Sequence, residues 1–131
     1  MIQIEISPGE LIDRLTILEI KLDRIHDARK RRNVETEHAI VRAAYDAHVA
    51  PSETLGSLVD ELRDVNLRLW TIEGDIRACE RRREFGPAFV ALARSVYLCN
   101  DRRSELKREI NALLGSKLRQ ENPTPPIERR P

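Results

Sequence analysis

Apolar residues recur at alternating steps of three and four through residues 55–79 of the chain. The series runs through Leu55, Leu58, Leu62, Val65, Leu69, Ile72, Ile76 and Cys79. A seven-residue repeat of this kind places every member on one side of a helix. The pattern therefore predicts a long helix over residues 52–84, whose apolar side must be covered by other helices.

The same repeat returns after the sequence Phe85-Gly86-Pro87 and predicts a second long helix over residues 87–118. Its members are Phe89, Leu92, Val96, Cys99, Arg103, Leu106, Ile110 and Leu113. Gly86 is expected to end the first helix in the left-handed conformation, and Pro87 is suited to the first position of the next one. The two long helices are therefore predicted to form an antiparallel hairpin.

Two further helices are expected to pack on this hairpin, over residues 7–27 and 34–49. Ser7, Pro8 and Glu10 form a helix start with a capping box, and the helical pattern is lost between residues 26 and 33. The predicted fold is an all-α bundle in one domain, residues 1–121, followed by a flexible proline-rich tail over residues 122–131.

Residues 1–6 alternate isoleucine with polar residues, which is a short strand pattern. A single strand needs a partner, and two interpretations stay open. The segment pairs with its symmetry mate in a dimer, or it lies extended over the bundle.

Composition supports the helical interpretation and narrows the function classes. Charged residues make up 34% of the chain and aromatic residues 4%, a mixture typical of helical bundles, and the net charge is +1. Such a balance gives no overall field to attract nucleic acid, so nucleic-acid binding is not expected. The chain has no apolar run long enough to cross a membrane and no secretion signal, so a cytoplasmic protein is expected. His26, His38 and His48 share no helical spacing, and neither a metal site nor a cofactor is expected.

The unequal helix lengths predict self-association. The long hairpin extends beyond the two shorter helices at its Phe85 end and is expected to expose Ile76, Cys79, Leu92 and Val96. An exposed apolar stripe usually marks an interface, so an antiparallel homodimer is predicted, with an unidentified protein partner as a further option. In the alternative, the first helix or residues 1–6 fold over the gap.

Polar residues beside the two apolar stripes form the candidate site. They are Glu19, Glu73, Arg77, Asn100, Arg103 and Lys107. Arg103 lies on the core side of its helix and needs a carboxylate partner, for which Glu73 and Glu19 are the candidates. One interpretation is a structural ion pair that fixes helix register. The other is an anion pocket in which Arg77, Arg103 and Lys107 are the donors. No catalytic residue is assigned.

Three groups of residues resemble a family of small bacterial helical proteins that is catalogued as a domain of unknown function. They are residues 6–13 (ISPGELID) with 18–21 (LEIK), residues 69–73 (LWTIE) with 75–77 (DIR), and residues 92–97 (LARSVY) with 100–103 (NDRR). The resemblance extends to Leu118 and implies a bacterial helical protein, but it transfers no activity or site.

A second resemblance is to the all-helical chorismate mutases, which are dimers of long helices. It lies in Leu11-Ile12-Asp13 followed by Leu15, Leu18 and Leu22, although the arginine that those enzymes place ahead of the Ile-Asp pair is missing. This resemblance implies that Arg77, Arg103 and Lys107 would bind a small diacid. The function expected from the sequence is a non-enzymatic interaction or assembly module, and a small-anion-binding enzyme of the chorismate mutase type is the alternative.

Overall fold

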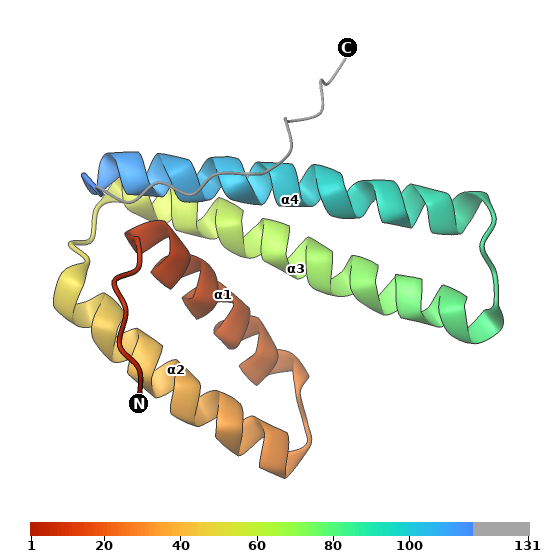
Figure 1. Ribbon diagram of the computed structural model, residues 1–131, viewed down its shortest axis with the longest axis horizontal. Helices are drawn as coiled ribbons and strands as arrows, with labels where there is room; N and C mark the ends of the chain where they lie inside the picture. The colour runs from red at the N-terminus through yellow and green to blue at the C-terminus, as the bar shows by residue number, and fades with distance from the viewer. Residues whose placement is uncertain (117–131) are drawn as a thin grey trace.

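The computed structural model describes residues 1–116, which form four helices and no strand (Figure 1). The helices are α1 (Pro8–Arg24), α2 (Ala28–His48), α3 (Glu53–Arg82) and α4 (Pro87–Leu113). The all-α fold predicted from the repeats is confirmed. The predicted tail over residues 122–131 and the domain end at residue 121 lie outside the described residues.

Helices α3 and α4 form the antiparallel hairpin that the repeats predicted (Figure 1). Ser52 caps α3 by accepting a hydrogen bond from the Leu55 amide at 3.1 Å. The prediction of a left-handed Gly86 is wrong, because Arg83 takes that conformation with φ 53°. The amide of Glu84 donates to the carbonyl of Cys79 at 3.0 Å and closes the helix ahead of the glycine. Gly86 instead caps the start of α4 in an extended conformation.

Helix α1 lies against both arms of the hairpin, and α2 packs along α1. The capping box is present in part, since the Glu10 amide donates to the Ser7 hydroxyl at 3.2 Å. The predicted start of the second helix at residue 34 is wrong. Asp27 caps α2 by accepting from the Lys30 amide at 2.9 Å, so the basic residues 29–32 extend the helix on its solvent side. The first helix ends at Arg24 rather than near residue 27.

The core consists of two clusters that share α1. The larger cluster joins α1 to the hairpin and contains Ile12, Leu55, Leu62, Val65, Leu69, Leu106 and Ile110. The smaller cluster joins α1 to α2 and contains Leu15, Leu18, Val34 and Val41. Because α1 supplies a buried face to each cluster, it is the element that connects the two helical pairs.

The far half of the hairpin is covered by no other helix of the described chain (Figure 1). Helix α3 has 30 residues and α1 has 17, so at about 1.5 Å per residue α1 spans less than two thirds of the length of α3. Figure 1 also shows α1 diverging from the hairpin along its length. The predicted overhang at the Phe85 end is therefore present.

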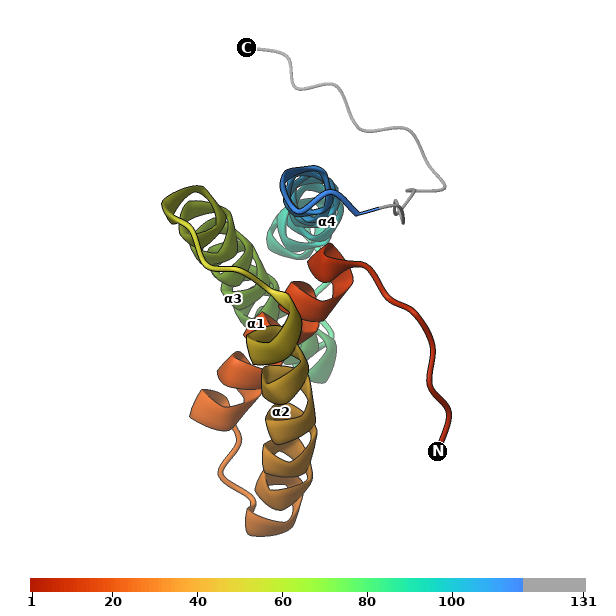
Figure 2. The ribbon, with the colours of Figure 1, turned by 90° about the vertical axis from the view of Figure 1, so that its left-hand side faces the viewer.

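Residues 1–6 are extended and project away from the helices (Figure 2). The Ile2 and Ile4 side chains are 93% and 72% exposed. The segment therefore does not cover the uncovered half of the hairpin. Among residues 1–116, no helix is both long enough and apolar enough to cross a membrane.

Candidate functional site

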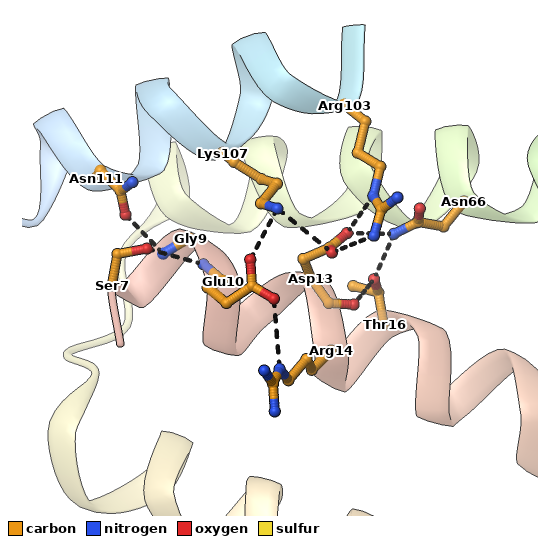
Figure 3. Close-up of polar contacts among 10 residues, drawn as sticks. All are labelled: Ser7, Gly9, Glu10, Asp13, Arg14, Thr16, Asn66, Arg103, Lys107 and Asn111. Carbon is orange, nitrogen blue, oxygen red and sulfur yellow. Dashed lines mark hydrogen bonds and ion pairs between the residues drawn. The ribbon is translucent and has the colours of Figure 1, made fainter. Parts of the chain in front are cut away.

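A buried carboxylate lies where α1 crosses the hairpin (Figure 3). The Asp13 side chain, on α1, is 1% exposed and accepts hydrogen bonds from both other helices of the crossing. Arg103, on α4, donates from Nε to Oδ1 at 2.9 Å and from Nη2 to Oδ2 at 2.5 Å. A bidentate pair of this kind fixes the distance and orientation of the two helices.

The same pair determines the charge of the site. The hydrogen bond from Arg103 to Asp13 raises the pKa of the guanidinium above its ordinary value, and the nearby carboxylates of Asp13, Glu10 and Glu73 add to this effect. Burial acts in the opposite direction. Arg103 is therefore a permanent cation, held by a carboxylate that has almost no contact with solvent.

Helix α3 completes the coordination of Asp13 through Asn66. The Asn66 amide nitrogen donates to Asp13 Oδ1 and to Thr16 Oγ1, both at 2.9 Å. The Thr16 hydroxyl in turn donates to the backbone carbonyl of Asp13 at 2.8 Å. Three helices thus meet at one carboxylate, and its oxygens are occupied by donors from α3 and α4.

A second ion pair extends the cluster toward the start of α1 (Figure 3). Lys107 Nζ lies 2.9 Å from Glu10 Oε2 and 3.7 Å from Asp13 Oδ2. The Lys107 and Glu10 side chains are 15% and 25% exposed. Two cations therefore face two carboxylates, and a third cation, the half-exposed Arg14, lies 3.4 Å from Glu10 Oε1.

The first turn of α1 touches α4 directly at Gly9. The Gly9 amide donates to Asn111 Oδ1 at 2.7 Å. A Cβ atom on Gly9 would lie 2.5 Å from the Lys107 carbonyl oxygen and 2.8 Å from Asn111 Oδ1, so only glycine permits this approach. The Asn111 amide nitrogen is buried and has no hydrogen-bond partner within residues 1–116.

A cleft of about 310 Å³ opens beside this cluster, where α1 begins to leave the hairpin. Three of the predicted site residues, Glu73, Asn100 and Arg103, line it together. The remaining lining residues are Ile17, Ile20, Lys21, Asn66, Leu69 and Trp70. Residues equally distant from the Gly86 bend face each other in an antiparallel hairpin, so the sequence predicts Glu73 to be level with Cys99 and Asn100, which is consistent with this arrangement.

The other predicted site residues lie elsewhere. Glu19 pairs with Arg63 at 3.5 Å, Lys107 pairs with Glu10, and Arg77 is exposed and does not line the cleft. The expected partner of Arg103 was Glu73 or Glu19, and this prediction is wrong because Asp13 holds both donating nitrogens. The three cations proposed as anion donors therefore share no pocket.

Asp13, Asn66 and Thr16 were missed from the sequence, although a signal for them exists. Gly9, Asp13, Thr16 and Ile20 follow steps of four, three and four, and all four are buried. They form a second stripe on α1 beside its leucine stripe. Small and polar residues at a regular helical spacing can mark a face that packs closely against another helix, just as regularly spaced leucines can.

Two hollows, each of about 490 Å³, lie along the α3–α4 hairpin and share Ser95. Arg68 and Asp75 line them from α3, and they lie about 200° and 180° around the helix from Asn66, which faces α1. These hollows, named here the hairpin groove, are therefore on the side of the hairpin opposite α1.

The four predicted interface residues divide between the groove and the interior of the hairpin. Cys79 and Leu92 line the groove, whereas Ile76 and Val96 do not. The prediction that the overhang exposes Cys79 is wrong, because the hairpin itself leaves that residue only 4% exposed. Ile76, Leu92 and Val96 are half-buried. Both cysteines are free thiols, and residues 1–116 contain no group of three or more His, Cys, Asp or Glu side chains placed to hold a metal ion.

No family model, no curated protein and no solved structure matches this chain.

Proposed function

We propose that the chain is a non-enzymatic assembly module that binds a second copy of itself through the hairpin groove. The observation that carries this proposal is the groove itself, which runs along the face of the hairpin opposite α1 and continues into the half that no other described helix covers. Its α3 lining extends from Val65 to Arg82, or about 26 Å at 1.5 Å per residue. That length suits a helix of a partner rather than a small molecule.

The lining of the groove supports a packed helix. Its Phe85 half is formed largely by small and apolar side chains, among them Ala78, Ala88, Ala91 and Leu92. Small residues let two helix backbones approach closely. Ala88 and Ala91 are exposed in the single chain, so a second helix would find them accessible.

A second copy is the proposed partner because the Phe85 end of the hairpin carries an exposed aromatic side chain as well as the groove. Phe85, at the end of the hairpin, is 51% exposed and packs edge-on against Phe89 with ring centroids 5.2 Å apart. In an antiparallel two-fold pair, the Phe85 end of each hairpin lies along the groove of the other copy, so both copies use the same surface, as a two-fold interface requires.

The polar cluster supports a structural role for the α1 crossing. Arg103 and Lys107 are matched by Asp13 and Glu10, and the Asp13 oxygens are occupied by protein donors. A general acid or base must lie within hydrogen-bond distance of its substrate. An anion-binding site needs hydrogen-bond donors that are not already bonded to protein carboxylates. The cluster therefore fits the positioning of α1 on the hairpin better than it fits the alternative of a diacid-binding enzyme.

The proposal is tested by filling the groove. Ala91→Glu adds a charged side chain to the groove lining, and Ala112→Glu makes the same change at another exposed alanine of α4, outside the groove. Both positions tolerate a helix-forming residue, so both variants are expected to fold. Size-exclusion chromatography with light scattering should give a lower molar mass for Ala91→Glu than for the wild type and Ala112→Glu.

An independent measurement needs no variant. Because unfolding of an assembly is linked to its dissociation, the melting temperature of the wild type should rise with protein concentration. Equal masses for all three proteins would overturn the proposal, and so would a wild type whose mass is that of one chain.

A further inference from the structure

Residues 1–6 form an arm whose backbone is free to pair with another strand. Within residues 1–116, none of its amide or carbonyl groups takes part in a hydrogen bond. The arm is extended and stands clear of the helices (Figure 2). Free backbone groups in an extended segment are a template for β pairing.

The arm and the neighbouring face of α2 are unusually apolar for a surface. They enclose a hollow of about 850 Å³, which is lined by the arm, Leu11, Val41 and Ala44 among others. Eight large hydrophobic side chains are exposed among the described residues, and four of them, Met1, Ile2, Ile4 and Ile40, lie on the arm or on the facing side of α2. Burying these apolar side chains against another surface would therefore be favourable, and the single chain does not bury them.

We propose that the arm pairs antiparallel with the arm of a second copy, in a register centred on Ile4. In this register Ile4 lies opposite Ile4 of the second copy, and Ile2 lies opposite Ile6. Opposite residues of an antiparallel pair share one face of the ribbon, so all six isoleucines of the two arms lie on one face. Gln3 lies opposite Glu5 on the other face, so no two like charges are opposed.

The sequence of the arm selects this register over its neighbours. A shift of the centre to Glu5 places two carboxylates opposite each other and brings Pro8, which has no amide proton, opposite Ile2. A shift to Gln3 places Met1 opposite Glu5, and among residues 1–6 it opposes isoleucine to isoleucine only between Ile2 and Ile4. In the registers whose two-fold axis lies between two residues, Gln3 and Ile4 or Ile4 and Glu5, isoleucines lie opposite Gln3 or Glu5, so each face of the ribbon carries both apolar and polar residues.

The partner is a second copy because the register is symmetric. Residues 2–6 have the same alternation of isoleucine and polar residues in both directions from Ile4, so a two-fold axis through Ile4 opposes isoleucine to isoleucine and Gln3 to Glu5 throughout. The ribbon turns its isoleucine face toward the hollow beside α2, where Ile40 is 61% exposed. This inference uses no residue of the hairpin groove and does not rest on the proposed function.

Disulfide trapping with single cysteines tests the register directly. Cys79 and Cys99 are first replaced by alanine, and then Ile4→Cys, Gln3→Cys and Glu5→Cys are made separately in the full chain. Directly opposite residues have Cα atoms about 4.5–5.5 Å apart, within reach of a disulfide. Diagonal neighbours are about 7–8 Å apart, which is beyond that reach.

With an added oxidant, Ile4→Cys should therefore form a covalent dimer, whereas Gln3→Cys alone and Glu5→Cys alone should not. An equal mixture of Gln3→Cys and Glu5→Cys should recover the covalent dimer. No residue of the arm belongs to either core cluster, so circular dichroism should show the same helix content in every variant. Equal crosslinking of all three single variants, or none by Ile4→Cys, would overturn the inference.

Discussion

Replacing Arg103 by methionine leaves the Asp13 carboxylate buried without its bidentate partner. Asp13 is 1% exposed, so the loss of its counter-ion costs more than the pair itself contributes. Breaking a buried pair in this way costs roughly 3–5 kcal/mol. Lys107 remains 3.7 Å from Asp13 Oδ2, and the Arg103 side chain is 30% exposed, so we expect the lower end of that range, about 3 kcal/mol.

Arg63→Met is the matched control. Arg63 also connects α3 to α1, through Glu19 at 3.5 Å, but the two side chains are 38% and 34% exposed. Exposed ion pairs contribute less than about 1 kcal/mol, so this variant should remain close to the wild type. The free energy of unfolding is measured by urea denaturation at one protein concentration, with helix content as the signal.

A double-mutant cycle separates the pair from the packing of its methylene groups. Asp13→Asn removes the buried charge and leaves Arg103 able to reach solvent, so it should cost less than Arg103→Met. The loss of stability in the double variant should be smaller than the sum of the two single-variant losses by about 1–3 kcal/mol, because neither partner is left as an unpaired ion. An Arg103→Met variant no less stable than Arg63→Met would refute the account of the crossing.

Four further substitutions test the fold at single positions by the same urea assay. Gly9→Ala should destabilise by at least about 1–3 kcal/mol, because the added methyl group meets the α4 backbone, whereas Gly56→Ala in the open first turns of α3 should stabilise by about 0.5–1 kcal/mol. A stable Gly9→Ala would show that α1 does not approach α4 so closely. Arg83→Gly should stabilise by about 0.5–1 kcal/mol, since Arg83 takes the left-handed conformation at the end of α3, and no gain would mean that the helix ends elsewhere. Leu106→Ala should cost about 2–5 kcal/mol because Leu106 is fully buried between the helices, and a cost below 1 kcal/mol would contradict that placement.

The hairpin could be predicted from the sequence because one physical signal determined it. The seven-residue spacing continues along α3 and along α4, where Arg103 is its one charged member, and a long helix with one apolar side has few ways to bury it. The start of α2 was harder, because the basic residues 29–32 have good helix propensity and no apolar periodicity. Asp27 decides that boundary through one hydrogen bond to the Lys30 amide.

The partner of Arg103 could not be deduced from the hairpin alone. Residue levels along α3 and α4 follow from counting outward from the bend, but the height and angle of α1 do not. Those depend on Gly9, where a missing side chain lets α1 approach α4, and on Asn66, which reaches α1 from α3. At Leu15 and Leu18 the leucine stripe of α1 faces α2 rather than the hairpin. The spacing of the leucines therefore does not predict that Asp13 faces the hairpin.

We propose assembly through two separate surfaces, the hairpin groove and the arm. Sedimentation velocity over a range of concentrations tests it with four proteins: the wild type, Ala91→Glu in the groove, Ile4→Glu on the arm, and the double variant. The account predicts more than two copies for the wild type, two copies for each single variant, and one copy for the double variant. A wild type that sediments as one chain at every concentration would contradict assembly through either surface. A single variant with the mass of the wild type would show that the surface it alters takes no part in assembly.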